Sequence, residues 1–264
     1  MRGPARTALN DSARTLRAGL RLAALCATTA ALYSVWAAGA AALSVSKRAR
    51  ARWRAVVFRT WARAASALIG MELRVSGAAP RPPFLLVVNH LGYADVVALA
   101  ASCECVFVAK KEVAGWPVVG RLCRRVGTIF IDRRSRRDIP RALSLVEAAL
   151  DDGAGVVLFA EGTSTRGAGV LPFKSSLLEA AARRGLPVHY ASLSYRTPAG
   201  ETRADSSVCW WGDMTFPRHF FRLLELKGFR ADLAFGEEAI LEGDRKALAW
   251  KLRAAVSARF VPVG

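Results

Sequence analysis

Acidic residues are scarce in this 264-residue chain, which has 21 aspartates and glutamates against 39 lysines and arginines and a formal net charge of +18. The scarcity is most pronounced in residues 1–64, where Asp11 is the sole acidic residue beside 12 basic ones. A basic segment that adjoins an apolar one indicates, first, binding to the anionic lipids of a membrane surface. Binding to nucleic acid is the competing interpretation.

Cysteines are also few, and none of the five belongs to a Cys-x-x-Cys pair; they are Cys26, Cys103, Cys105, Cys123 and Cys209. An odd, scattered set of this kind indicates structural thiols in a reducing compartment rather than a disulfide framework. We expect Cys103 and Cys105 to lie on one face of a strand, which would make them a poor metal clip. No His/Cys cluster has the spacing of metal ligands, so no metal site is predicted.

Three common catalytic or nucleotide-binding motifs are absent. The chain has no Gly-x-Ser-x-Gly nucleophile elbow. Gly115 and Gly120 have the spacing of a P-loop, but Arg121 follows where a P-loop has lysine. Gly153 and Gly155 lack the third glycine of a dinucleotide-binding fingerprint. These absences leave no sequence signal for a nucleotide cofactor or an activated serine.

One long stretch, Leu22 to Ser46, has no charged residue. As a continuous helix it would be about 37 Å long, enough to cross a hydrocarbon core of about 30 Å. It is rich in alanine and therefore only mildly hydrophobic, so it either spans the bilayer or lies in one leaflet. A cleaved signal peptide is the alternative, although the run is longer than a typical apolar signal region.

The segment from Arg52 to Ile69 has apolar residues at helical spacing with arginines between them. This pattern favours a basic amphipathic helix at the membrane interface over an ordinary surface helix packed on a domain. We therefore expect membrane-anchoring helices over residues 1–70 and a second domain over 71–264. The basic residues from Lys47 to Arg63 favour an inner-membrane location with this second domain in the cytoplasm.

From Met71 onward, short β-like runs alternate with helical ones, which predicts an α/β domain with a mixed, largely parallel sheet flanked by helices. The predicted strands are Glu72–Val75, Phe84–Asn89, Cys105–Ala109, Thr128–Ile131, Val156–Ala160, Val188–Ser194, Ser207–Trp211 and Arg230–Phe235. The predicted helices are Val96–Ser102, Pro117–Val126, Ile139–Asp151, Ser175–Arg184, Pro217–Leu226 and Asp244–Phe260.

Polar residues follow several of these strands, at the edge where α/β proteins place their sites. His90 and Asp95 follow the second strand, Lys110 the third, Arg133 the fourth and Glu161 the fifth. A histidine oriented by a carboxylate is a candidate general base, and the cationic groups suit an anionic substrate. The pair can meet only if the chain folds back between them; otherwise Asp95 is a helix N-cap and His90 a hydrogen-bonded core histidine.

Three blocks in the chain resemble motifs of the glycerolipid acyltransferase family, in particular the lysophosphatidic acid acyltransferases. The first is Asn-His-x4-Asp, the second Gly-x-x-Phe-Ile-Asp-Arg and the third Phe-Pro-Glu-Gly-Thr, in that order. They are matched by Asn89, His90 and Asp95, by Gly127, Phe130, Ile131, Asp132 and Arg133, and by Phe159, Glu161, Gly162 and Thr163. The chain departs from the pattern at Ala160, usually proline, and at Gly92, commonly serine.

The resemblance implies a glycerol-3-phosphate acyltransferase-like fold and the roles of several residues. His90 would act as the base and Asp95 would orient it, with no covalent acyl-enzyme. Arg133, and more weakly Lys110, would hold the phosphate of a lysolipid acceptor, and Glu161, Gly162 and Thr163 would complete the acceptor site. Acyl-CoA or acyl carrier protein would be the co-substrate, membrane lipids would be partners, and no cofactor or nucleic acid would be needed.

The favoured activity is therefore acyl transfer to 1-acyl-sn-glycerol-3-phosphate, which gives phosphatidic acid. A first alternative is the same chemistry on another lysolipid, such as lyso-ornithine lipid. A second, from another class, is an inactive acyltransferase fold that binds membranes or nucleic acid through its basic surface. Leu186, Pro187 and Val188 match a fourth block of the family only loosely, and neither this block nor the Arg-rich run 133–137 distinguishes between the two acceptors.

Overall fold

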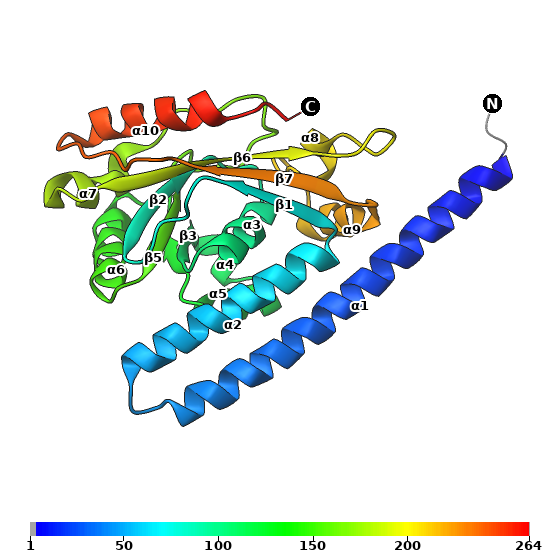
Figure 1. Cartoon of the computed structure of the whole chain (residues 1–264), viewed down its shortest axis with the longest axis horizontal. Helices are drawn as coiled ribbons and strands as arrows, with labels where there is room; N and C mark the ends of the chain where they lie inside the picture. Colours follow the sequence, from blue (N-terminus) through cyan, green and yellow to red (C-terminus); the bar gives the residue numbers. More distant parts are fainter. Residues whose placement is uncertain (1–3, 264) are drawn as a thin grey trace.

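Seven strands form a single sheet in the computed structural model, which describes residues 4–263, in the order β1-β7-β6-β2-β5-β3-β4 (Figure 1). The strands are β1 (Met71–Ser76), β2 (Phe84–Val88), β3 (Val106–Lys110), β4 (Ile129–Ile131), β5 (Gly155–Phe159), β6 (Val188–Arg196) and β7 (Phe229–Phe235). All neighbouring pairs are parallel except β6 with β7. The predicted α/β fold with a mixed, largely parallel sheet is thus confirmed.

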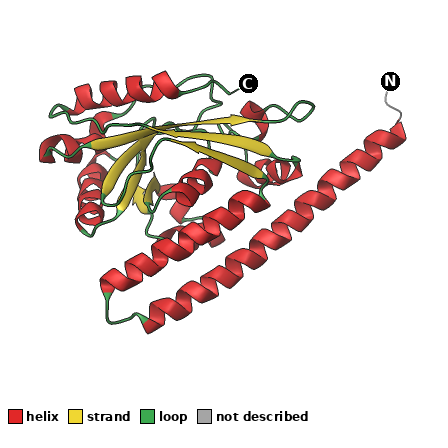
Figure 2. Cartoon of the chain, viewed as in Figure 1, coloured by secondary structure: helices red, strands yellow, loops and turns green. Residues whose placement is uncertain are grey.

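Helices precede the sheet and flank it on both faces (Figure 2). The α-helices are α1 (Pro4–Ala42), α2 (Lys47–Leu68), α3 (Ala94–Ser102), α4 (Lys111–Ala114), α5 (Pro117–Arg125), α6 (Ile139–Asp151), α7 (Glu179–Arg184), α8 (Ala204–Ser207), α9 (Phe216–Glu225) and α10 (Arg245–Arg259). Two short 3-10 helices are η1 (Arg136–Asp138) and η2 (Ser175–Leu178).

Strand β2 lies in the middle of the sheet and is buried on both faces. Leu86 and Val88 pack into the core shared with α2, α3 and α9, whereas Leu85 and Val87 pack into the core shared with α6, α7 and α10. A parallel strand covered on both sides has a continuous apolar sequence instead of an alternating one. The apolar run that precedes His90 therefore places this histidine just after a fully buried strand.

The carboxyl ends of β2, β3, β4 and β5 meet at one edge of the sheet because these four strands are mutually parallel. The polar residues singled out in the sequence follow these four strands. The topology thereby gathers segments far apart in the chain at a single edge, as is usual for sites in open α/β sheets.

Helices α1 and α2 form an antiparallel hairpin beside the sheet domain (Figure 1). Arg17 and Arg21 donate hydrogen bonds from α1 to the backbone carbonyls of Glu225 and Leu226 at the end of α9. These carbonyls lack helical partners, and a cation near a helix C-terminus is favourable. In α2, Arg59 and Arg63 similarly donate to carbonyls at the end of α3, so both helices are attached to the domain.

The uncharged segment is not one continuous helix. Helix α1 ends at Ala42, and the chain turns back before α2 starts at Lys47, with Ser46 as its N-cap. The uncharged helical part, from Leu22 to Ala42, is about 31 Å long. The part of α1 from Ser12 to Ala42 is long and apolar enough to cross a membrane by length and composition alone, and signal sequences share these properties.

Two local predictions are wrong. The predicted strand Ser207–Trp211 instead comprises the end of helix α8 and a loop, in which Trp210 N–H bonds to the carbonyl of Leu91. Cys103 and Cys105 do not share a strand face, because Cys103 ends helix α3 and Cys105 precedes β3. In both places apolar residues pack into the core from loops, which a strand-like composition does not distinguish.

Candidate active site

Asn89 directly follows β2 and connects it to β6. Its side-chain amide donates to the carbonyl of Leu193 at 2.9 Å, and its side-chain carbonyl accepts the Leu193 N–H at 2.8 Å. A buried amide satisfied on both ends replaces the strand ladder at this point. The next residue, His90, is therefore held firmly at the carboxyl edge of the sheet.

His90 and Asp95 are in direct contact, with 2.7 Å between His90 Nδ1 and Asp95 Oδ2. The same carboxylate oxygen accepts the backbone N–H groups of Leu91 at 2.7 Å and Gly92 at 3.0 Å. These bonds fold the chain back between His90 and Asp95. The two side chains can therefore meet, which the sequence alone did not decide. Asp95 is fully buried in the first turn of α3, and Tyr93 occupies the N-cap position, so the alternative interpretation of Asp95 as an N-cap is wrong.

The His90 ring is fixed by a second contact. It stacks on Phe159 with 4.1 Å between ring centroids and 16° between ring planes. An ionised carboxylate only accepts hydrogen bonds, so Asp95 favours the tautomer that carries the proton on Nδ1. Nε2 then has the free lone pair, and the side chain remains 18% exposed. A histidine held in this way can act chemically as a general base.

Gly92 lies against the backbone of the loop after α8. A Cβ atom at this position would be 2.9 Å from the backbone nitrogen of Trp210. That nitrogen donates to the Leu91 carbonyl at 2.8 Å, which attaches the loop to the turn between His90 and Asp95. The close approach explains why this chain has glycine where the resembled family commonly has serine.

Glu161 follows β5 and clamps the backbone on both sides of the site. Its Oε1 accepts the N–H of His90 at 2.6 Å and its Oε2 accepts the N–H of Leu171 at 2.9 Å. The side chain is buried, which raises the pKa of its carboxyl, while these two backbone N–H groups act in the opposite direction. Both oxygens are thus used for shaping the site and are turned away from solvent.

Arg133 is exposed and reaches the Glu161 segment, where its guanidinium donates to the carbonyl of Gly162. Gly162 has a φ of 73°, in the left-handed region that favours glycine. Thr163 is exposed next to it. The structure therefore brings the second and third sequence blocks together, with a cation at the rim of the site.

Lys110 is the last residue of β3, and its ammonium lies 5.8 Å from the centroid of the Trp210 ring. Trp210 belongs to a cluster of aromatic side chains that also contains Tyr93, Trp116, Phe216 and Phe220. Lys110 is thus linked to the His90 turn through Trp210 and not through a direct bond to His90 or Asp95.

Tyr195 is a residue of the site that the sequence patterns did not single out. It is fully buried in β6, and its hydroxyl donates to Asp95 Oδ1 at 2.7 Å. Burial, followed by the nearby Asp95 charge, raises its pKa well above the ordinary value, so it remains a donor. Tyr195 reaches Asp95 because β6 pairs with β2, and no local sequence pattern predicts that pairing.

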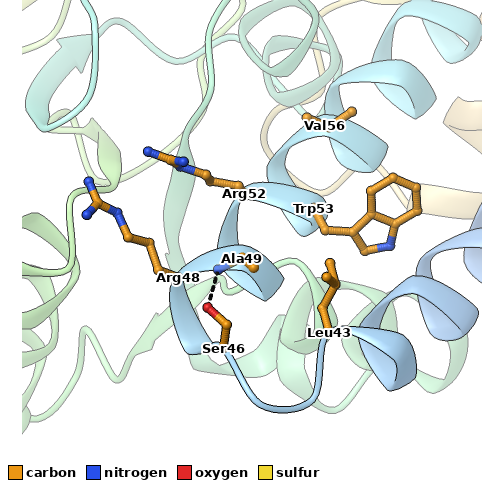
Figure 3. A pocket seen from close by; sticks show the side chains of 7 residues that line it. All are labelled: Leu43, Ser46, Arg48, Ala49, Arg52, Trp53 and Val56. Atoms are coloured by element: carbon orange, nitrogen blue, oxygen red, sulfur yellow. Dashed lines mark hydrogen bonds between the residues drawn. The ribbon is translucent and has the colours of Figure 1, made fainter.

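Two cavities occur away from His90. One, of about 420 Å³, lies at the bend between α1 and α2 (Figure 3). The other, of about 490 Å³, lies beside β4 and is lined by residues that include Lys111, Phe130 and Arg141. Among the side chains of residues 12–135 and 137–263, no group of three or more His, Cys, Asp or Glu is arranged to hold a metal ion.

Comparison with known proteins agrees with this geometry. The family model described as Acyltransferase matches residues 72–194. A 1-acyl-sn-glycerol-3-phosphate acyltransferase from Neisseria gonorrhoeae is 32% identical over 213 residues, which cover 79% of this chain and 82% of the relative. A lyso-ornithine lipid O-acyltransferase from Rhodobacter capsulatus is 35% identical over 178 residues, which cover 66% of this chain and 63% of the relative.

A solved structure has the same fold. The crystal structure of the 1-acyl-sn-glycerophosphate acyltransferase PlsC from Thermotoga maritima aligns with a TM-score of 0.66 and 18% sequence identity, covering 93% of this chain and 97% of that chain. The likeness includes the mixed sheet, its flanking helices and the region of the N-terminal hairpin. On the strength of the sequence relatives, with the fold in agreement, this chain belongs to the acyltransferase family.

Proposed function

We propose that this enzyme transfers a fatty acyl group from an acyl thioester to the free hydroxyl of 1-acyl-sn-glycerol-3-phosphate, giving phosphatidic acid. The observation that carries the proposal is the contact between His90 Nδ1 and Asp95 at the carboxyl edge of the sheet, with the His90 side chain still 18% exposed. The names of the Neisseria relatives support the choice of acceptor.

The mechanism follows from the tautomer of His90. Nε2 takes the proton of the acceptor hydroxyl as the oxygen forms a bond to the thioester carbonyl carbon. Asp95 stabilises the resulting imidazolium through Nδ1–H. When the tetrahedral intermediate collapses, the C–S bond breaks and the imidazolium returns its proton to the leaving thiolate. The products are the ester and a free thiol, and His90 is regenerated as the neutral base.

The acceptor phosphate would be bound by Arg133, whose guanidinium stands at the exposed rim of the site. Lys110, at the end of β3 and beside Trp210, would contribute more weakly. Gly162 and Thr163 would line the path between Arg133 and His90. Glu161 would complete the acceptor site by holding the backbone of His90 and Leu171. A charge-assisted contact to phosphate is roughly twice as strong as a neutral hydrogen bond, which suits Arg133 to this role.

The second candidate acceptor is lyso-ornithine lipid. It is favoured by the Rhodobacter relative, and a relative from Pseudomonas aeruginosa with the same name is 34% identical over 166 residues. The chemistry at His90 would be unchanged, because both acceptors present a free hydroxyl. The donor is acyl-CoA or acyl carrier protein in either case, and the reaction as written requires no further cofactor.

The N-terminal region, residues 1–70, would hold the catalytic domain, 71–264, at the inner membrane with the site facing the cytoplasm. Figure 3 shows Arg48 and Arg52 on one side of the start of α2, with Leu43, Trp53 and Val56 on the other. Because the basic helix α2 runs beside the uncharged half of α1, this hairpin suits a shallow position among lipid headgroups and upper acyl chains.

Membranes containing the protein, incubated with each lysolipid and each donor, would test the function. We expect one acceptor class to be esterified and the product to be lost in His90→Ala. His189→Ala is the matched control, because His189 lies on β6 outside the contacts described above, and it should retain activity. Undiminished acylation by His90→Ala would contradict the base assignment, and a preference for lyso-ornithine lipid would replace the favoured acceptor.

A further inference from the structure

Asp95 accepts four hydrogen bonds, and Tyr195 supplies the one farthest from it in the chain. Oδ2 accepts from His90 Nδ1 and from the N–H groups of Leu91 and Gly92, whereas Oδ1 accepts from the Tyr195 hydroxyl at 2.7 Å. Among the side chains of residues 12–135 and 137–263, Tyr195 alone donates to Oδ1. The Tyr195 bond and the three bonds to Oδ2 together fix how the carboxylate is rotated about its long axis.

The hydroxyl of Tyr195 has no other evident use. Tyr195 is completely buried between the sheet and its helices, where phenylalanine would fill nearly the same volume. A buried hydroxyl is costly unless it is hydrogen-bonded. A tyrosine at this place is thus accounted for by its contact with Asp95, since the packing of the ring alone requires no oxygen.

We propose that Tyr195 is a positioning residue for acyl transfer, which holds the Asp95 carboxylate in the rotation that keeps the proton on His90 Nδ1 and leaves Nε2 unprotonated, ready to accept the proton of the acceptor hydroxyl. The inference rests on the proposed role of His90 as the general base. Tyr195 acts through Asp95 and does not touch the substrate.

Three further titratable groups lie near this pair, namely Glu161, Cys209 and Tyr93. Burial raises the pKa of Tyr93, so it stays a neutral phenol. Glu161 faces His90 from the end of β5, where its oxygens accept backbone N–H groups. Cys209 faces Asp95 from the loop after α8, and burial followed by the Asp95 charge raises its pKa, so it stays a neutral thiol. Replacing Tyr195 therefore removes a hydrogen bond from Asp95 while leaving both His90 and Asp95 unchanged in the sequence.

The direction of the effect of Tyr195→Phe can be worked out. Without the hydroxyl, the negative charge on Asp95 is less well stabilised and attracts the imidazolium more strongly. The His90 imidazolium should persist to higher pH, and because the base acts in its neutral form, the acid limb of the rate profile should move to higher pH. We also expect kcat to fall about 10- to 100-fold, the size associated with a hydrogen bond to a charged group.

The test compares the wild-type enzyme, Tyr195→Phe and Tyr190→Phe, using pH profiles of kcat and KM. Tyr190 lies on the same strand but in the other core, so its variant controls for loss of a tyrosine hydroxyl from β6. We expect a lower kcat, a shifted acid limb and nearly unchanged KM values in Tyr195→Phe alone. An acid limb that coincides with that of the wild type, or moves to lower pH, would overturn the inference.

A second readout does not depend on turnover. The chain has three histidines, so NMR titration of imidazole signals can be assigned with single His→Ala variants. Tyr195→Phe should raise the titration midpoint of His90 and leave those of His189 and His219 in place. If the wild type were inactive on every lysolipid, the proposed function would fail, and this titration would still decide whether Tyr195 controls the His90–Asp95 pair.

Discussion

The carboxylate of Glu161 accepts the backbone N–H of His90 at 2.6 Å, across 71 residues of sequence. Its other oxygen accepts the N–H of Leu171. Asp95 orients the His90 ring from one side, and Glu161 holds the His90 backbone from the other. The first and third sequence blocks thus meet through a buried carboxylate that braces the proposed base.

Glu161→Gln should destabilise the protein and reduce its activity. Glutamine can offer only one acceptor oxygen, so its NH2 group would face one of the two backbone N–H donors. Leaving a buried donor unsatisfied costs about 1–3 kcal/mol, which thermal or denaturant unfolding would detect. Glu237→Gln is the control, since Glu237 is 88% exposed and its replacement should change neither stability nor kcat. If Glu161→Gln and Glu237→Gln had equal stability and equal kcat, Glu161 would not hold the His90 backbone as described.

Asp95→Asn should lower kcat by about 10³- to 10⁴-fold, as expected when the partner that sets a histidine tautomer is replaced by an amide. The substitution keeps the shape of the side chain but removes its charge and half of its acceptor capacity. Asp151→Asn, at an exposed position in α6, should leave kcat unchanged. A folded Asp95→Asn enzyme with nearly full activity would rule out the pairing as a catalytic arrangement.

Gly92→Ser should impair this enzyme even though related sequences commonly have serine there. The added Cβ would come within 2.9 Å of Trp210 N and force apart the bond between Trp210 and Leu91. Overpacking of this kind costs about 1–3 kcal/mol. Gly169→Ser tests the same chemical change in open space, because a Cβ at Gly169 meets nothing within 4 Å. If the unfolding midpoint fell equally in Gly92→Ser and Gly169→Ser, the close approach of Gly92 to Trp210 N would not be the cause.

Arg133→Ala should raise KM for a phosphate-bearing acceptor by about 10- to 100-fold, the effect of removing a hydrogen bond to a charged group. The acceptor is bound in both the ground and transition states, so kcat should change less than KM. Arg134→Ala, the next exposed arginine of the same loop, should have little effect. The measurement is steady-state kinetics with varied acceptor concentration. An unchanged KM in Arg133→Ala would show that Arg133 does not bind the acceptor phosphate.

Asp138 should make stability dependent on pH. Hydrogen bonds from Arg141 and then from the Asp132 N–H lower the pKa of this carboxyl, so its ionised form stabilises the loop that carries Arg133. This stabilisation is complete above the unfolded pKa of about 3.9 and is lost as pH falls toward the lower folded value. Unfolding midpoints of wild type and Asp138→Asn should therefore differ near neutrality and converge in acid; a constant difference would contradict this assignment.

Much of the fold follows from local patterns in the chain. The apolar run of β2 and the helical spacing of α6 and α10 predict the elements because burial on two faces or on one stripe leaves a direct periodic signal. The three sequence blocks likewise identify His90, Asp95, Arg133 and Glu161 from residue order and spacing alone. The loop around Trp210 is the exception, since its apolar residues are buried without any regular period.

What the sequence determined by itself is the family resemblance, the basic and apolar character of the N-terminal region and the set of polar residues that follow the strands. The tertiary structure alone decided how these residues act on one another. Asp95 is bound by Tyr195, and His90 by Glu161, because β6 and β5 lie on either side of β2. Strand order is a non-local property, set by packing of the whole chain, and no run of neighbouring residues encodes it.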